Sequence, residues 1–132
     1  MERVTRFGSY GILVQDCKIL LTLKRDGPYK GLWDLPGGGI EFGESPEQAM
    51  KRELLEESAL EIVDMDFSTL ATAVGCYGNL EFHHVGIIYK ITNWIERSDL
   101  KPEEENRLEN LNDIDPEHLT PFARQAVIHL FD

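Results

Sequence analysis

Two stretches rich in β-branched and apolar residues lie near the start of the chain and predict a β-hairpin. The first runs from Val4 to Val14 and the second from Lys18 to Lys24. Such composition favours extended strands. Gln15 and Asp16 separate the two stretches, so we expect a tight turn there and antiparallel pairing of the strands.

The next patterned segment has the signature of a helix with a defined start. Ser45 is a preferred N-cap residue, Pro46 follows it where a missing N–H costs nothing, and Gln48 completes a capping box. Residues 26–31, Asp-Gly-Pro-Tyr-Lys-Gly, have the turn chemistry of a loop. The pattern therefore predicts a strand, a loop and then a helix that begins at Pro46.

The second half of the chain adds two strands and a final helix. We expect strands over 63–77 and 82–92, with the intervening Gly-Asn pair as the turn. An acidic linker follows, and residues 113–119 are expected to be irregular or to form one helical turn. Thr120 and Pro121 begin the last helix. Its apolar stripe consists of Phe122, Ala123, Ala126, Val127 and Leu130.

Three carboxylates crowd one face of the helix that begins at Pro46. Glu53, Glu56 and Glu57 are spaced i, i+3 and i+4, so they lie within about one turn of each other. Like charges at these spacings, near the C-terminal end of a helix, are unfavourable by a few tenths of a kcal/mol each. A divalent cation reverses this cost, because clustered carboxylate oxygens are ligands that Mg²⁺ and Mn²⁺ prefer. A solvated acidic face is the alternative, but the preceding glycines, the capped start and Arg52 favour the metal site.

Composition and charge limit the classes of function. The chain has 132 residues, 42% of them hydrophobic, which suits one compact domain over residues 1–132. Its formal net charge of −11 argues against non-specific binding of nucleic acid and against attachment to an anionic membrane. A polyanionic substrate would need a cation to accompany it. The sequence has no basic and apolar leader and no apolar run of about 18 residues, so we expect a cytoplasmic protein.

The two cysteines, Cys17 and Cys76, lack the spacing of a metal or redox motif. Both lie in apolar, strand-like contexts, so we expect buried, reduced thiols. We therefore assign them no chemical role.

A fixed register of glycine, glutamate, arginine and aliphatic residues spans positions 38–60. Its members are Gly38, Glu44, Arg52, Glu53, Leu54, Glu56, Glu57 and Leu60. This run resembles the Nudix box, G-x5-E-x7-R-E-U-x-E-E-x-G-U with U an aliphatic residue, at every fixed position but one. Ala59 stands where the box has glycine, which implies about 1 kcal/mol of strain or a different helix end. The preceding Leu-Trp-Asp-Leu-Pro-Gly-Gly at 32–38 also resembles the family.

The resemblance to the Nudix family, of the MutT-like kind, covers most of the chain. It implies an α/β fold, an α/β/α sandwich with a mixed β-sheet between helices. It also implies a Mg²⁺-dependent Nudix pyrophosphohydrolase that acts on acid anhydrides, with Mn²⁺ as an alternative cation.

The glycine run and the glutamates together suggest a ligand set for this cation. Glycines at 37–39 let the backbone approach a ligand closely, and the Gly37 carbonyl can complete a metal shell whose other ligands are carboxylates. By resemblance to the family, Glu56 and Glu57 are metal ligands. Glu53 either binds the metal or takes the proton from the attacking water.

Arg52, Glu41 and Glu44 accompany these glutamates. Arg52 either offsets their charge through an i, i+4 pair with Glu56 or, as in the family, holds the catalytic carboxylates by charge-assisted hydrogen bonds. Glu44 either belongs to the site or only favours the helix N-terminus electrostatically. Glu41 either belongs to the site or is an exposed turn residue, so both glutamates are candidate substrate-binding residues.

Further candidates lie outside the helix or before it. Arg25, at a strand end, is a candidate phosphate contact or a surface charge, and Gly38 can present its backbone to a phosphate. The run Glu103–Glu105 is expected to be solvated, although some relatives supply a metal ligand or base from this region, which makes Glu105 a weak candidate. His83 and His84 are adjacent on a strand and point to opposite faces, so at most one faces the substrate.

These inferences predict metal-dependent hydrolysis of a diphosphate linkage, in a nucleoside diphosphate linked to another moiety or in a nucleoside triphosphate. The box accounts for phosphate chemistry only, so hydrolases of damaged nucleotides and of ADP-ribose or nucleotide sugars are both compatible. The alternative is a non-catalytic nucleotide- or ADP-ribose-sensing domain of the same fold, against which the intact Arg52, Glu53, Glu56 and Glu57 argue. We expect a nucleotide-type small molecule as partner and neither nucleic acid nor membrane, and the prediction allows a homodimer.

Overall fold

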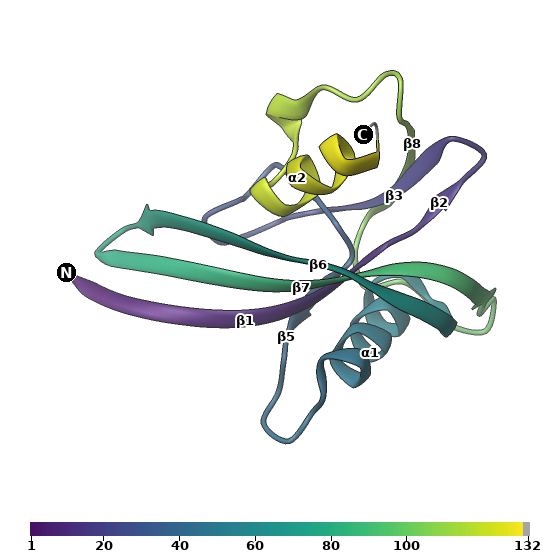
Figure 1. Cartoon of the computed structure of the whole chain (residues 1–132), viewed down its shortest axis with the longest axis horizontal. Coiled ribbons are helices and arrows are strands. Elements are labelled where there is room, and N and C mark those ends of the chain that lie inside the picture. Colours follow the sequence, from purple (N-terminus) through teal and green to yellow (C-terminus); the bar gives the residue numbers. More distant parts are fainter. Residues whose placement is uncertain (131–132) are drawn as a thin grey trace.

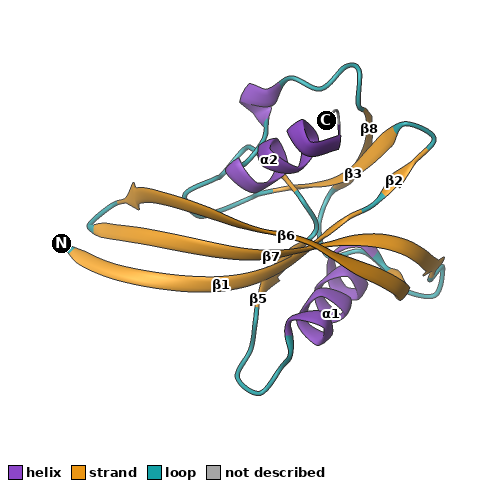
Figure 2. Cartoon of the chain, in the orientation of Figure 1, coloured by secondary structure: helices purple, strands orange, loops and turns teal. Residues whose placement is uncertain are grey.

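The computed structural model describes residues 1–130, which form two β-sheets and two α-helices (Figure 1). In chain order the elements are β1 (Glu2–Ile12), β2 (Val14–Gln15), β3 (Lys18–Leu23), β4 (Trp33–Asp34), β5 (Gly37–Gly39), α1 (Pro46–Ser58), β6 (Leu60–Tyr77), β7 (Leu80–Glu96), β8 (Asn106–Asn110), the 3₁₀ turn η1 (Pro116–His118) and α2 (Pro121–Leu130). In the views of Figures 1 and 2, α1 and α2 lie on opposite sides of the long strands.

The central sheet is mixed. Its strand order is β5-β1-β7-β6. β1 and β7 run parallel, whereas β5 pairs antiparallel with β1 and β6 pairs antiparallel with β7. A mixed sheet between helices confirms the predicted α/β/α sandwich.

The second sheet is built around β3. β2 and β4 pair antiparallel with β3, and β8 pairs with β3 over Lys18–Thr22. After the acidic linker, this pairing joins β8 to the second sheet, and the chain then continues through η1 to α2.

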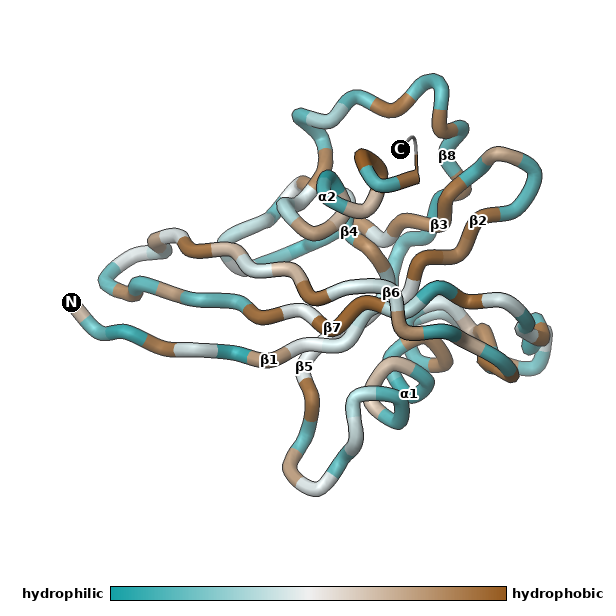
Figure 3. Tube along the Cα trace, viewed as in Figure 1, coloured by the Kyte–Doolittle hydropathy of each residue, from teal (hydrophilic) through white to brown (hydrophobic). Residues whose placement is uncertain are grey.

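Each helix covers its own hydrophobic cluster. α2 contributes Phe122, Ala123, Ala126 and Val127 to one cluster with β3 and β7, and α1 contributes Met50 and Leu54 to the other. The hydrophobic parts of β2, β3 and β7 run between the helices in Figure 3. Burial of these apolar faces supplies the main stabilisation of the sandwich.

The helix α1 begins as the sequence predicts. The Ser45 hydroxyl accepts a hydrogen bond from Gln48 N, and the Gln48 side chain accepts one from Ser45 N, which completes the capping box. At the other end Ala59 adopts the left-handed conformation, with φ 55° and ψ 38°. The helix therefore keeps an exit that ordinarily suits glycine.

Most predicted strands and both predicted helices are confirmed, including the two-residue turn at Gly78 and Asn79 and the helical turn within 113–119. The first turn was placed one residue too early. Gln15 pairs with Lys18, so the turn consists of Asp16 and Cys17, with φ of 52° and 62°.

The prediction of buried cysteines is wrong. Cys17 is exposed in the turn between β2 and β3, and Cys76 is exposed near the end of the edge strand β6. The prediction also missed three short strands, β4, β5 and β8.

Among the described helices, none is both long and apolar enough to cross a membrane.

Candidate active site

Glu57 lies deepest of the three helix glutamates. Its Oε2 accepts a hydrogen bond of 2.8 Å from Gly37 N, which ties the last turn of α1 to β5. Burial, opposed by the Gly37 N–H and aided by the nearby Glu53 carboxylate, raises the pKa of the Glu57 carboxyl to about 8. A cation at this carboxylate would therefore stabilise a charge that the protein alone disfavours.

Glu53 packs against the backbone of Gly38. A Cβ at residue 38 would lie 2.7 Å from the Glu53 carboxyl carbon, so only glycine lets the carboxylate approach the strand this closely. Gly37 is equally restricted, because its φ is 146° and a side chain there would clash with the Ser9 carbonyl. Burial is also the main cause that raises the pKa of Glu53.

Arg52 holds the outer side of this cluster. Its Nε donates to Glu44 Oε2 at 2.7 Å, and its Nη1 donates to Glu53 Oε1 at 2.9 Å and to Glu56 Oε2 at 3.4 Å. Its Nη2 donates to the Gly39 carbonyl at 3.1 Å. The guanidinium therefore fills both roles that the sequence left open, and it holds the pKa of Glu44 below its usual range.

A polar cavity of about 240 Å³ opens beside Glu57. It is lined by Leu23, Lys24, Arg25, Asp26, Glu57 and Glu104. Arg25, a candidate phosphate contact, lines this cavity, but it donates from Nη2 to the Glu103 carbonyl at 2.6 Å and from Nε to Glu104 Oε2 at 3.4 Å. The segment after β7 does place an acidic residue here, although that residue is Glu104 and Glu105 does not line the cavity.

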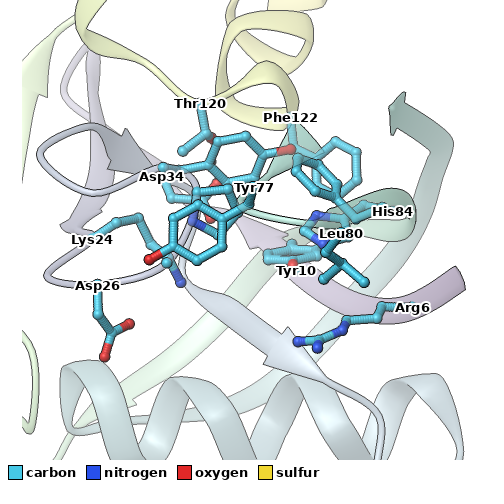
Figure 4. Close-up of a pocket in the computed structure, with 14 residues that line it drawn as sticks. Arg6, Tyr10, Lys24, Asp26, Asp34, Tyr77, Leu80, His84, Thr120 and Phe122 are labelled. Carbon is cyan, nitrogen blue, oxygen red and sulfur yellow. Dashed lines mark hydrogen bonds between the residues drawn. The ribbon is translucent and has the colours of Figure 1, made fainter. Parts of the chain in front are cut away.

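A second, aromatic pocket of about 400 Å³ lies next to the polar cavity (Figure 4). Its rings come from distant segments: Tyr10, Tyr29, Tyr77, Phe82, His84 and Phe122. Tyr29 meets Phe82 and His84 edge to face, with ring centroids 5.8 and 5.7 Å apart. Arg6 lies at one end of the pocket and Lys24 with Asp26 at the other.

Asp34 supplies a buried carboxylate to this pocket and is only 5% exposed. Its Oδ1 accepts hydrogen bonds from Leu35 N at 2.8 Å and from the Thr120 hydroxyl at 2.6 Å. Over residues 1–130 no group donates to Oδ2. Every fully buried polar side-chain atom in this range has a hydrogen-bond partner, so Oδ2 is not fully buried. Because Asp34 lines the pocket, we infer that Oδ2 is accessible from it. Burial raises the pKa of Asp34, an effect that both hydrogen bonds and Lys24 oppose.

Lys24 lines both the polar cavity and the aromatic pocket. Its charge lowers the pKa values of Asp34, Glu53 and Glu57, so it lies near all three carboxylates. Within the described part of the chain it forms no ion pair. Sequence reasoning selected the neighbouring Arg25 and missed Lys24, since nothing in the sequence distinguishes two adjacent cations at a strand end.

The structure thus brings together Gly37, Gly38, Arg52, Glu53, Glu56 and Glu57. Glu44 and Glu41 lie on the outer side of Arg52 and line neither cavity. His83 and His84 diverge as predicted, and His84 faces the aromatic pocket. Beyond Lys24, sequence reasoning missed Glu104, Asp34 and the aromatic lining, which have no common sequence signal.

The donor set fits a hard divalent cation. Glu53 and Glu57 offer carboxylate oxygens whose ionised form burial disfavours, and Glu56 adds another one turn away. Over residues 1–130, no three acidic, histidine or cysteine side chains converge closely enough to hold an ion as they stand. Arg52 binds Glu53 and Glu56 whereas the Gly37 N–H binds Glu57, so cation binding would require these carboxylates to turn toward one another.

Comparison with known proteins places the chain in a family. The model of the NUDIX domain matches residues 5–130. The chain is 48% identical over 50 residues to the ADP-ribose pyrophosphatase of Methanocaldococcus jannaschii, covering 38% of this chain and 30% of that protein. It is 39% identical over 75 residues to the oxidized purine nucleoside triphosphate hydrolase of Danio rerio, covering 57% of this chain and 42% of that protein. These matches therefore span less than half the length of either relative.

Solved structures share the fold. The MutT NUDIX hydrolase of Burkholderia pseudomallei superposes with a TM-score of 0.78 at 23% identity, covering 96% of this chain and 97% of that chain. The MutT protein of Bacillus halodurans gives a TM-score of 0.73 at 22% identity, covering 95% of this chain and 81% of that chain. With the family model matched over nearly the whole sequence, the chain belongs to the NUDIX family.

Proposed function

We propose that this protein is a metal-dependent hydrolase that cleaves a diphosphate linkage in a nucleotide-type substrate. The observation that carries the proposal is the pair of adjoining cavities that share Lys24. One cavity is polar, with Glu57, Glu104, Lys24 and Arg25 in its lining, and the other is aromatic. This pairing suits a ligand with a polyanionic half and a planar half.

The phosphate half would lie at the polar cavity. Glu53, Glu56, Glu57 and the Gly37 carbonyl would hold Mg²⁺, with Mn²⁺ as the alternative. A bound cation of this kind neutralises charge on diphosphate oxygens and lowers the pKa of a bound water. Arg52 would keep Glu53 and Glu56 in place through the hydrogen bonds described above.

Proton transfer from the attacking water falls to a carboxylate at this cavity. Glu104, which lines the cavity with Glu57, and Glu53, which lies near Glu57 and has a pKa raised by burial, are the candidates. Lys24 would contact the phosphates, because it alone of the two neighbouring cations is not bound to a carboxylate of the described residues.

The planar half would occupy the aromatic pocket. The rings of Tyr29, Phe82 and His84 contact one another there. A planar base could stack on such rings or pack against their edges. Asp34 Oδ2 offers one hydrogen-bonding atom deep in the pocket. Burial together with the charges of Arg6 and Lys24 lowers the pKa of His84, which favours a neutral ring for stacking.

The names of the relatives support this division of the site. One relative is named an ADP-ribose pyrophosphatase and another an oxidized purine nucleoside triphosphate hydrolase, so both names describe hydrolysis of a nucleotide that carries linked phosphates. Both names are compatible with cleavage of a diphosphate linkage, and we propose that this protein cleaves the same kind of linkage.

A product-resolved assay tests the proposal. Purified protein with Mg²⁺ is incubated with nucleoside triphosphates, oxidised nucleoside triphosphates, ADP-ribose and nucleotide sugars, and both products of each reaction are identified. We expect turnover of at least one member, with cleavage between two phosphorus atoms. Binding of a nucleotide without turnover of any member would instead identify a sensing domain and contradict the proposal.

A further inference from the structure

Asn106, the first residue of β8, joins two segments that bear carboxylates of the polar cavity. Its Nδ2 donates to the Glu57 carbonyl at 2.8 Å and to the Glu104 carbonyl at 2.9 Å. Its Oδ1 accepts a hydrogen bond of 2.6 Å from the Ser58 hydroxyl. One side-chain amide therefore uses both of its N–H groups and its oxygen to connect the end of α1 with the segment Glu103–Glu105.

The main chains of these two segments form only two of the described hydrogen bonds, and one of the two is longer than the bonds of the Asn106 side chain. Glu103 N donates to the Glu56 carbonyl at 3.0 Å, and Glu104 N donates to the Glu57 carbonyl at 3.4 Å. The Asn106 bond to the same Glu57 carbonyl is shorter by about half an ångström. At residue 57 the side-chain amide is therefore the better of the two links.

The other contacts of the segment lead away from the helix. Arg25 binds the Glu103 carbonyl and the Glu104 carboxylate, and Leu23 N donates to the Glu105 carbonyl at 3.0 Å. These contacts fix the segment against the end of β3. The position of the Glu104 main chain relative to Glu57 depends instead on Asn106 and on the two main-chain bonds to α1.

We propose that Asn106 is a positioning residue that fixes Glu104 beside Glu57 in the polar cavity. This inference rests on the proposed function in so far as it concerns turnover. Asn106 touches neither cavity itself and acts through the main chain of both glutamates.

The role requires an amide in particular. Aspartate has almost the same shape but no N–H to donate, and it would place negative charge against two carbonyl oxygens. Strand pairing does not require asparagine, because the register of residue 106 with Thr22 is a backbone contact that other residues can form. The variants Asn106→Ala and Asn106→Asp therefore remove the link while leaving the strand.

Asn110→Ala is the matched control at the other end of β8. Among residues 1–130, the only described hydrogen-bond partner of the Asn110 side chain is the local Asn112 N, and Asn110 lines neither cavity. We expect kcat to fall at least about tenfold in Asn106→Ala and further in Asn106→Asp, with KM changed less than about threefold. Asn110→Ala should stay within about twofold of the unsubstituted protein.

A double-mutant cycle separates positioning from general loss of structure. If Asn106 acts through Glu104, then Asn106→Ala should change kcat less than about twofold in a Glu104→Gln background. Losses that multiply independently would overturn the proposal, as would a Glu104→Gln variant with unchanged kcat.

Amide hydrogen exchange of the metal-free protein supplies a readout that does not depend on turnover. Asn106→Ala should speed exchange at Glu103 and Glu104 N–H, while Asn110→Ala should not. Unchanged exchange at both amides would overturn the proposal. A protein that hydrolyses nothing in the substrate panel would refute the proposed function, and exchange would still decide whether Asn106 holds the segment.

Discussion

Glu57 and Glu47 lie on the same helix in opposite surroundings. Glu57 is buried against Gly37, whereas Glu47 is exposed on the first turn and lines neither cavity. We predict that Glu57→Gln lowers kcat by at least about a hundredfold with the fold retained, because it removes a charged ligand from the site. Glu47→Gln should leave kcat within about twofold.

Steady-state kinetics and circular dichroism of both variants make this comparison. Similar losses in the two variants would show that the general negative charge of α1, rather than a localised site, is responsible.

Lys24 and Lys30 form a second matched pair, in the same connection between β3 and β4. Lys24 lies between the two cavities, and Lys30 is exposed and lines neither. A charged hydrogen bond contributes about 1.5–3 kcal/mol, so Lys24→Met should lower kcat/KM by about ten- to a hundredfold. Lys30→Met should change it less than about twofold, and an equal effect of both would exclude Lys24 as the phosphate contact.

At the scale of elements, the structure follows the sequence most closely where local chemistry determines the backbone. α1 starts at Pro46 because Ser45 and Gln48 satisfy its first N–H groups, and these residues are contiguous in sequence. β8 could not be predicted, because Asn-Arg-Leu-Glu-Asn is polar and its Leu108 is 47% exposed. β8 is held by backbone pairing with β3, and no residue type in β8 indicates this pairing.

The exit of α1 gives a prediction at Ala59. The left-handed conformation disfavours a residue with a Cβ by about 1–2 kcal/mol, which glycine would relieve. The Ala59 methyl group is buried, and its removal offsets about 0.8 kcal/mol of that gain. We therefore expect Ala59→Gly to raise the free energy of unfolding by a few tenths of a kcal/mol, up to about 1.

Urea denaturation measures this change, with Lys51→Gly as the control in the exposed middle of the same helix. That control should lower stability by about 1 kcal/mol. Destabilisation by Ala59→Gly would mean that the methyl contacts outweigh the strain, and a kcat change above about threefold would mean that the exit positions the metal ligands closely.

At the scale of the whole molecule, the site divides into a part that the sequence predicts and a part that it does not. Glu53, Glu56 and Glu57 are close in space because they are close on one helix. The aromatic pocket combines residues from β1, the β3–β4 loop, β7 and α2, which only the tertiary fold brings together. The choice between Arg25 and Lys24 likewise depends on which side chain the Glu103–Glu105 segment binds.

The pKa of Glu57 makes the stability of the metal-free protein depend on pH. Its carboxyl ionises near 4.5 in the unfolded chain and near 8 in the folded one, so between these values only the folded state retains the proton. The free energy of unfolding should therefore fall as pH rises from about 5 to 8. In excess chelator, the stability of the unsubstituted protein relative to Glu57→Gln should decrease over this range, and a constant difference would contradict the assignment.

Dependence of turnover on a divalent cation is the most direct test of the account. The rate of diphosphate cleavage is measured on the best substrate of the panel, first with millimolar Mg²⁺ and then in excess chelator. We predict that turnover is lost in chelator and returns when Mg²⁺ or Mn²⁺ is restored, because in the proposed function Glu53, Glu56 and Glu57 would act on the substrate through a bound cation. Undiminished turnover in chelator would contradict the account.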